Sequence, residues 1–170
     1  AIDPLAPGYW EWEEAARQYA TEEVVRAETL AFGADRLGRD IVQKVLKGQD
    51  PLHILGDGSQ IRHYTYGGDL AEGIVTAMEH PAARNEDFNL STAESTTVLE
   101  LAEVIWRKIN GPDVPLRTVS DPGYEHDVNR RVPSTTKAKE VLGFEATTSL
   151  EDMLDEVIPW ITQALADGRI

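Results

Sequence analysis

Short apolar runs alternate with longer amphipathic segments through most of the chain, and this alternation limits the fold more than any other feature. The runs are too short to be helices and have strand-like composition, at residues 52–55, 60–66, 88–90 and 114–119. Segments with helical spacing separate and follow them, at about 36–47, 69–78, 97–110, 134–142 and from 149 onward. This order predicts an α/β or α+β fold, a small mixed sheet with packed helices, rather than a helical bundle.

Capping patterns mark several of the predicted helix starts. Thr97 and Glu100 have the spacing of a capping box, and Ser149 with Asp152 begins the last helix in a similar way. Asp69 is expected to cap the helix at 69–78. Pro159 is expected to kink the last helix, because proline lacks the N–H that helix interiors need.

The turn Gly56-Asp57-Gly58 joins two of the predicted strands. Its glycines allow the positive φ angles of a tight connection. Glycine-rich turns can also cradle phosphate groups. Both interpretations of this turn are open from the sequence.

The charge balance excludes several classes of partner. The net charge is −14, and no run of Lys or Arg offsets it, so nucleic acid and anionic membrane surfaces are not expected partners. No apolar run approaches the roughly 20 residues of a membrane span, and the first residues do not resemble a signal peptide. The absence of cysteine excludes disulfides, thiolate catalysis and Cys-ligated zinc. We expect a cytoplasmic protein.

The segment Gly56 to Asp69, GDGSQIRHYTYGGD, is the most informative motif in the chain. It resembles the GdGxQxRxfxyvxD segment of the extended short-chain dehydrogenase/reductases (SDRs), specifically the NAD-dependent nucleotide-sugar epimerases and dehydratases. Further segments resemble motifs of the same family in the same order, at 88–91 (FNLS), 98–105, 137–144 (KAKEVLGF) and 149–154 (SLEDML), followed by Trp160. The resemblance covers about residues 41–165 and implies the C-terminal, substrate-binding portion of such an enzyme.

Residues 1–40 depart from that family's pattern, and residues 10–32 predict an acidic amphipathic helix. We therefore expect an N-terminal helical arm at 1–40 and an epimerase-like substrate-binding domain at 41–170. The fold implied is a truncated extended-SDR C-terminal domain with an added N-terminal helix. The predicted helix at 69–78 would then lack the sheet that it covers in the family, and its exposed apolar face predicts homo-oligomerisation.

The motif carries the first candidate site. In a strand, Gln60, Arg62, Tyr64 and Tyr66 would share one face, which would offer an amide, a guanidinium and two phenols. Arginine forms bidentate, charge-assisted hydrogen bonds with phosphate oxygens. The family resemblance implies that Arg62 binds the diphosphate of a nucleotide sugar. An exposed arginine on an edge strand is the alternative.

A second candidate site lies around Asp127. This residue occupies the acidic position of the family's RxgD motif, which helps to bind the nucleotide diphosphate or ribose, but Tyr124 stands where the family has arginine. Arg130 or Arg131 could supply the missing cation, and the spacing does not choose between them; a solvated charged loop is the alternative. The predicted substrate-binding residues are Gln60, Arg62, Tyr64, Asp127 and Arg130.

The sequence lacks the family's catalytic and cofactor-binding motifs. It contains neither a Gly-x-Gly-x-x-Gly turn nor a Tyr-x-x-x-Lys pair, in which the lysine lowers the phenol pKa. We therefore predict no catalytic residue and no NAD site in this chain, with NAD bound only by a missing cofactor half. The four histidines are scattered, and no metal site is expected.

Three functions fit these observations. The chain could be the substrate-binding part of an epimerase or dehydratase, inactive alone and completed by a cofactor-domain partner. It could be a separate module that binds nucleotide-diphosphate sugars. It could also be a non-catalytic scaffold or interaction protein derived from that domain. The first is the preferred interpretation.

Overall fold

The computed structural model describes residues 36–123 and 127–170. The predicted helix at 10–32 and the residue Tyr124 lie outside these ranges. The described residues divide into two compact units. The first unit contains residues 65–93 and 133–148, and the second contains residues 36–64, 94–123, 127–132 and 149–170.

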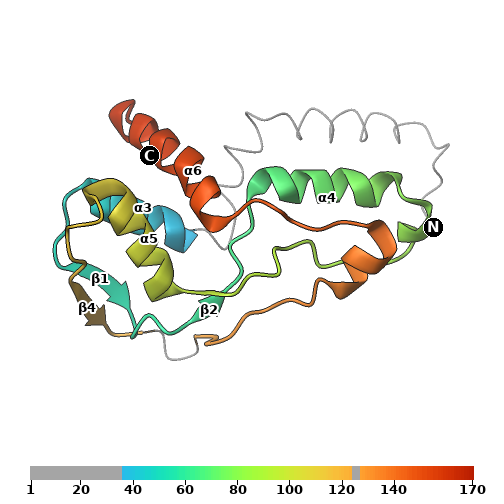
Figure 1. Ribbon diagram of the computed structural model, residues 1–170, viewed down its shortest axis with the longest axis horizontal. Helices are drawn as coiled ribbons and strands as arrows, with labels where there is room; N and C mark the ends of the chain where they lie inside the picture. Colours follow the sequence, from blue (N-terminus) through green and yellow to red (C-terminus); the bar gives the residue numbers. More distant parts are fainter. Residues whose placement is uncertain (1–35, 124–126) are drawn as a thin grey trace. The chain divides into compact units, whose positions relative to one another are not determined.

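The second unit contains both sheets. Strand β1 (Leu52–Leu55) pairs in parallel with β4 (Thr118–Asp121), and the two lie side by side in Figure 1. Strand β2 (Ile61–Arg62) pairs antiparallel with β3 (Thr96–Thr97). The predicted α/β fold is confirmed, but the strands form two two-stranded sheets instead of one mixed sheet.

Three predicted strands differ from the observed ones. The strand predicted at 60–66 is limited to Ile61–Arg62, and the one predicted at 114–119 lies at Thr118–Asp121. The run 88–90 forms no strand, because Phe88 and Leu90 pack their side chains against a buried cluster instead. Strands β1 and β2 do not pair with each other, since the backbone of β1 bonds to β4 and continues this pairing with a bond from the Gly56 N–H to the Asp121 carbonyl, 2.9 Å.

Three helices build the core of the second unit. They are α3 (Arg36–Leu46), α5 (Val98–Asn110) and α6 (Leu150–Ala166), and α3 lies against both of the others. Their apolar positions at helical spacing are buried, as the periodicity predicts. The largest fully buried side chains of this unit are Ile41, Val42, Leu52, Leu101, Ile105 and Ile161.

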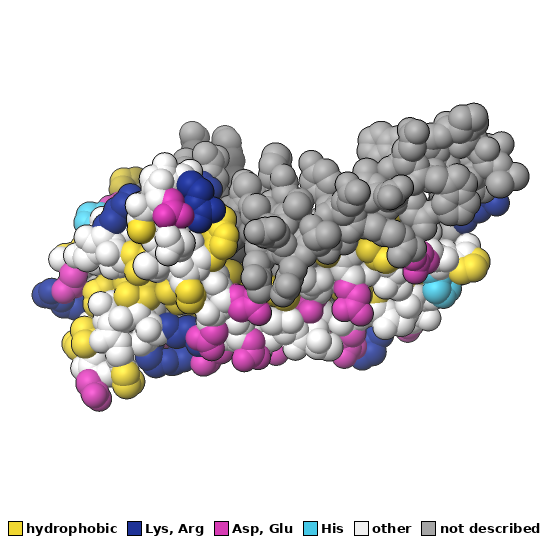
Figure 2. Space-filling model, turned by 90° about the horizontal axis from the view of Figure 1, so that it is seen from above, with side chains coloured by type: hydrophobic (Ala, Val, Ile, Leu, Met, Phe, Trp, Pro, Cys, Tyr) yellow, Lys and Arg dark blue, Asp and Glu magenta, His cyan; other side chains and the backbone are white. Residues whose placement is uncertain are grey.

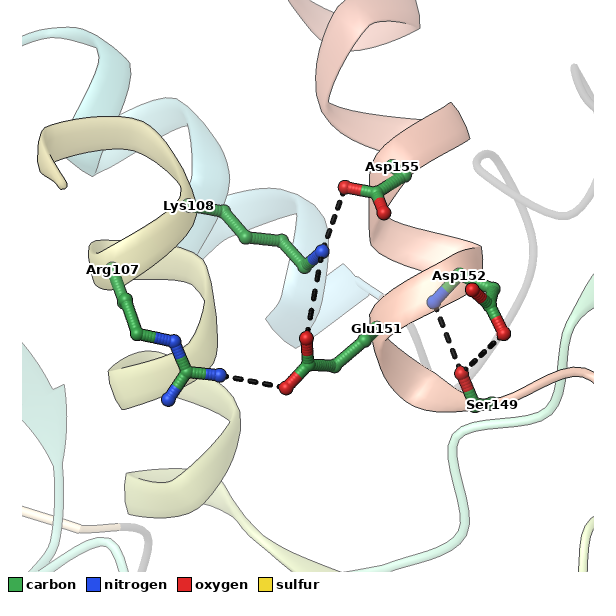
Figure 3. A network of polar contacts seen from close by, with 6 residues as sticks. All are labelled: Arg107, Lys108, Ser149, Glu151, Asp152 and Asp155. Atoms are coloured by element: carbon green, nitrogen blue, oxygen red, sulfur yellow. Dashed lines mark hydrogen bonds and ion pairs between the residues drawn. The ribbon is translucent and has the colours of Figure 1, made fainter. Parts of the chain in front are cut away.

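The predicted helix caps of the second unit are confirmed. The Thr97 hydroxyl accepts a hydrogen bond from the Glu100 N–H at 3.1 Å, and the Glu100 carboxylate accepts one from the Thr97 N–H at 2.7 Å. Ser149 likewise accepts from the Asp152 N–H at 3.1 Å. Helix α6 continues through Pro159. Figure 3 shows the start of α6 beside α5, linked by ion pairs from Arg107 and Lys108.

The first unit is built on α4 (Gly67–Glu79), with the short helical segments η1 (Pro81–Ala83) and η2 (Ala138–Leu142). A small apolar core forms around Ala138, Leu142 and Phe144. The prediction that Asp69 caps α4 is wrong. Tyr66 is the N-cap residue, and the buried Asp69 carboxylate instead accepts hydrogen bonds from Thr148.

The surface of the described residues is rich in acidic groups. Figure 2 shows Asp and Glu side chains (magenta) recurring along one face, in keeping with the net charge of −14. Two large apolar side chains of α4, Ile74 and Met78, are 45% and 44% exposed. None of the described helices is both long and apolar enough to cross a membrane.

Candidate functional site

Three of the predicted site residues, Gln60, Arg62 and Asp127, lie together in the second unit. The Arg62 Nη2 is 3.3 Å from Asp127 Oδ1, and the Gln60 Nε2 is 3.3 Å from Asp127 Oδ2. Each oxygen of the carboxylate therefore faces one donor. We call these three residues the Arg62 cluster.

The backbone around β2 brings the cluster together. β2 pairs with β3 on one edge, and on the other edge Ile61 forms a parallel bridge with Arg130. In this bridge the Ile61 N–H donates to the Asn129 carbonyl at 2.8 Å, and the Arg131 N–H donates to the Ile61 carbonyl at 3.1 Å. Residues 127–131, remote in sequence, are thereby fixed beside Gln60 and Arg62.

The guanidinium of Arg62 is held at several points. Its Nη1 donates to the Ile61 carbonyl at 2.8 Å and approaches the Asn129 carbonyl at 3.4 Å, while Nη2 faces Asp127. The Arg62 side chain is 15% exposed and that of Asp127 is 35% exposed. A partly buried guanidinium fixed in this way is preorganised for an anion, because little side-chain freedom remains to be lost on binding.

Gln60 supports the same group of contacts. Its Nε2 donates to the Leu55 carbonyl at 3.1 Å as well as to Asp127. Because both neighbours of this nitrogen are acceptors, the orientation of the amide is determined by its contacts. The Gln60 Oε1 is buried and accepts no hydrogen bond among the described residues. The site thus contains an acceptor that a hydroxyl, an amide or a water molecule would satisfy.

The four-residue face predicted for the strand does not form. The strand ends at Arg62, so its alternation does not extend to Tyr64 or Tyr66. The Tyr64 side chain is 6% exposed and belongs to the core. Tyr66 is the N-cap residue of α4, in the first unit. The prediction that Tyr64 offers its phenol on the surface of Arg62 is therefore wrong, whereas that for Tyr66 stays a prediction.

The bridge register relates the two candidate arginines to Arg62. Ile61 is directly opposite Arg130, and side chains directly opposite each other project from the same face of a sheet. By alternation, the face of Arg62 is shared by Arg131. Both Arg130 and Arg131 are exposed, and neither forms an ion pair with another described residue.

The turn at Gly56–Gly58 is filled by its own chain. A Cβ on Gly56 would come within 2.8 Å of the Gln60 Nε2, and one on Gly58 within 3.1 Å of the Leu99 Cβ. Both glycines have positive φ, 69° and 76°, as predicted. Hydrogen bonds from the side chain and backbone of Ser59 hold the pKa of Asp57 below its ordinary value, which favours a negative charge in the turn. These glycines serve close packing, and the phosphate-cradle interpretation is not supported.

The N-termini of α4, α5 and α6 do not suit the pyrophosphate of NAD. Dinucleotides place this group at a helix N-terminus, where backbone N–H groups and the helix dipole attract anions. The first turns of α4, α5 and α6 already carry acidic side chains, which would repel a pyrophosphate; they are Asp69, Glu100, Glu151 and Asp152.

The remaining titratable groups form local pairs. His53 Nδ1 lies 2.9 Å from Asp121 Oδ1 across β1 and β4, and His63 Nε2 lies 3.0 Å from the Ser95 hydroxyl. Within residues 36–123 and 127–170, no three His, Asp or Glu residues are grouped to hold a metal ion. The sequence analysis did not predict that the Leu55 and Asn129 carbonyls contact the Arg62 cluster. Every residue has a backbone carbonyl, so the residue type does not indicate which carbonyls take part in a site.

Comparisons with known proteins agree with this architecture. Residues 17–157 match the family model described as GDP-mannose 4,6 dehydratase. UDP-glucuronic acid decarboxylase 2 of Arabidopsis thaliana is 36% identical over 120 residues, which are 70% of this chain and 25% of that protein. A putative UDP-glucose 4-epimerase of Methanocaldococcus jannaschii is 32% identical over 71% of this chain and 37% of its own length.

Solved structures give the same result. The UDP-glucose 4-epimerase of Thermotoga maritima, solved with UDP-glucose, has a TM-score of 0.63 and 33% sequence identity, covering 74% of this chain and 39% of that one. An epimerase of Methanothermobacter thermautotrophicus has a TM-score of 0.70 and 26% identity, covering 78% and 39%.

The fold and these matches define an extended short-chain dehydrogenase/reductase. The chain belongs to the NAD-dependent nucleotide-sugar epimerase and dehydratase family of that class, through its match to the GDP-mannose 4,6 dehydratase model. It spans about a quarter to two fifths of the length of these relatives. The match begins at residue 17, so it includes part of the segment 1–40 that the sequence sets apart as an arm.

Proposed function

We propose that this chain is the substrate-binding part of an NAD-dependent nucleotide-sugar epimerase or dehydratase, and that the Arg62 cluster binds the diphosphate of the nucleotide sugar. The observation that carries the proposal is the fixed guanidinium of Arg62, 15% exposed and joined to Asp127 and Gln60. A guanidinium in this setting forms two parallel hydrogen bonds with phosphate oxygens.

The relatives support this class of ligand. The Thermotoga maritima epimerase is described with UDP-glucose, and a UDP-glucuronic acid 4-epimerase of Bacillus cereus is described in complex with UDP-glucuronic acid and NAD. The two matches cover 74% and 72% of this chain. A nucleotide-diphosphate sugar is therefore the substrate class that we propose for this chain.

A second arginine extends the proposed site. The sequence does not choose between Arg130 and Arg131, although Arg130 is the one named among the predicted site residues. The register of the Ile61 bridge supports Arg131 as the arginine on the face of Arg62. We assign Arg131 to the ligand's phosphates and keep Arg130 as its comparison. Tyr64 is left out of the proposed site because its side chain is buried.

The proposal does not assign the chemical step or the cofactor to the described residues of this chain. The N-termini of α4, α5 and α6 carry acidic side chains that would repel a pyrophosphate, and the sequence has no Tyr-x-x-x-Lys pair. We propose that this chain binds substrate without catalysing a reaction alone, and that a cofactor-binding part supplies NAD, which performs the hydride transfer when bound. The exposed Ile74 and Met78 of α4 support a contact with such a part or with a second copy of the chain.

Calorimetric titration tests this proposal. The chain is titrated with UDP-glucose, dTDP-glucose and NAD, and the titrations are repeated with Arg62→Ala and with Arg107→Ala as a matched loss of one guanidinium. We expect a sugar nucleotide to bind, Arg62→Ala to weaken that binding by about tenfold or more, and Arg107→Ala to leave it unchanged. Equal affinity in wild type and Arg62→Ala would refute the assignment of Arg62.

A further inference from the structure

Strand β4 has one edge that pairs with no other described strand. Its opposite edge is bonded in parallel to β1, and the two strands form a sheet of their own (Figure 1). β1 carries the buried Leu52 and Ile54, whereas residues 117–120 on β4 and beside it are all exposed. An exposed strand edge presents N–H and C=O groups that can pair with a strand of another chain.

The pairing with β1 determines which backbone groups point to the open edge of β4. The carbonyls of Arg117 and Asp121 accept hydrogen bonds from β1 and from the residue that follows it, at 2.8 and 2.9 Å. Backbone groups alternate between the two edges of a strand, so Val119 also bonds toward β1. The N–H and C=O groups of Thr118 and Ser120 therefore point to the open edge.

A second copy of the chain fits this edge in an antiparallel register. When Val119 lies opposite Val119 of the second copy, Thr118 of each copy is opposite Ser120 of the other. These two residues are the ones whose backbone groups point to the open edge, so both pairs exchange N–H···O=C hydrogen bonds. The arrangement has a two-fold axis and uses the same surface on both copies, as closed dimers do.

The charges on β4 are complementary in the same register. Arg117, Val119 and Asp121 share one face of the strand, and Arg117 of each copy is opposite Asp121 of the other. Arg117 is 66% exposed and binds Asp50 through Nε and Nη2, while its Nη1 has no partner among the described residues. A shift of the register by two residues would lose both charge pairs, because Arg117 would then be opposite Val119 or Gly123.

The pairing is limited to a short segment. Pro122 falls at a position whose N–H would point to the open edge, and proline has no N–H, so the ladder ends there. Such an interface buries less than the roughly 1,000 Å² of a stable complex. The net charge of −14 on each copy also opposes association. We expect a weak, reversible dimer.

We propose that β4 is a self-association surface, through which two copies of the chain pair antiparallel about Val119 and join their sheets into one. The ion pairs between Arg117 of one copy and Asp121 of the other select the register. This surface differs from the exposed apolar side chains of α4, and the inference is independent of the proposed nucleotide-sugar binding.

An exchange of charges between copies tests the proposal. Arg117→Glu sets two carboxylates opposite each other, and Asp121→Lys sets two cations opposite each other. Each single variant should therefore self-associate at least about tenfold more weakly than wild type. In an equimolar mixture of the two, the new glutamate faces the new lysine, and the remaining Arg117 faces the remaining Asp121. Because both ion pairs are regained, the mixture should associate within about threefold of wild type.

Analytical ultracentrifugation of the full chain at low ionic strength, over a series of concentrations, measures the association. Arg107→Glu is the matched control, because it makes the same charge change at an exposed arginine of α5, and Met78→Glu tests the apolar surface of α4. Both should associate as wild type does. Asp121→Lys makes the chain less negative, so weaker association in this variant does not come from net repulsion. Circular dichroism checks the fold of each variant.

A wild-type chain that stays monomeric at every concentration would overturn the proposal. Association that Arg117→Glu leaves unchanged, or that Met78→Glu alone abolishes, would place the contact on another surface and overturn it as well. Single variants that lose association and do not regain it on mixing would overturn the antiparallel register about Val119, and the proposal with it.

Discussion

The buried carboxylate of Asp69 accepts two hydrogen bonds from one residue, Thr148. The Thr148 N–H and hydroxyl each donate to it at 2.9 Å, across 79 positions of sequence. This contact fixes the segment that precedes α6 to the first turn of α4. Asp69 is 9% exposed, and its loss would leave the partly buried N–H and hydroxyl of Thr148 without their acceptor.

We predict that Asp69→Ala lowers the free energy of unfolding by about 2–3 kcal/mol, because hydrogen bonds to a charged group are lost in a buried position. Urea unfolding followed by circular dichroism measures the change. Glu72→Ala is the control, since Glu72 is an exposed carboxylate on the same helix. Equal effects of the two variants would contradict the role of Asp69.

Gly73 lies inside helix α4, yet we predict that replacing it with alanine destabilises the fold. Gly→Ala in a helix interior normally stabilises by about 1 kcal/mol. A Cβ at Gly73, however, would lie 2.8 Å from Cε2 of the Phe144 ring, which is itself buried. We expect Gly73→Ala to lower the melting temperature, and Phe144→Leu to restore part of the loss in the double variant. A higher melting temperature for Gly73→Ala would contradict this prediction, because it would show that the Phe144 ring moves aside without destabilising the fold.

The capping box at the start of α5 should make the stability of the fold decrease as the pH falls. Hydrogen bonds from the Thr97 backbone and hydroxyl lower the pKa of Glu100. A carboxyl with a lowered folded-state pKa stabilises the fold above its unfolded pKa, about 4.3, and this stabilisation is lost as the pH falls through the folded value. The difference in melting temperature between wild type and Glu100→Gln should therefore shrink below pH 4.3. A difference that stays constant from pH 7 to pH 3 would exclude this linkage.

The ion pairs between α5 and α6 are predicted to contribute modestly (Figure 3). Arg107 Nη2 lies 2.7 Å from Glu151, and Lys108 Nζ lies 2.7 Å from Asp155. Glu151 is 58% exposed, so Glu151→Gln should cost at most about 1 kcal/mol, and less in 1 M NaCl than in 0.05 M. Glu103→Gln on α5 is the control, because Glu103 is exposed and forms no ion pair with another described residue. A cost that is independent of salt would argue against an electrostatic origin.

Features set by neighbouring residues were predictable from the sequence. The caps Thr97 with Glu100 and Ser149 with Asp152 involve partners three positions apart, and the structure has both. The positive φ at Gly111, 94°, ends α5 as the Asn110-Gly111 pair indicates. The proximity of Gln60 and Arg62 follows from their short spacing. Asp127 was named only through a resemblance to a family motif, which did not predict its contact with Arg62, 65 positions away.

Features set by distant partners were not predictable. Asp69 is of a residue type that commonly caps helices, but here its carboxylate accepts hydrogen bonds from Thr148. No pattern of neighbouring residues predicts this contact, because the two residues are far apart in the sequence. The position of β4 depends on its register with β1, which begins at Leu52 opposite Thr118. Tyr64 alternates correctly with Arg62 in sequence, yet the strand ends between them and the phenol enters the core.

The most direct test of the central claim is ³¹P NMR of UDP-glucose during titration with the chain. If Arg62 binds the diphosphate, both phosphorus resonances should shift or broaden with wild type and with Arg107→Ala, and should stay at their free positions with Arg62→Ala. Resonances that stay unchanged with the wild-type chain, or that Arg62→Ala perturbs as strongly as wild type does, would contradict diphosphate binding by Arg62.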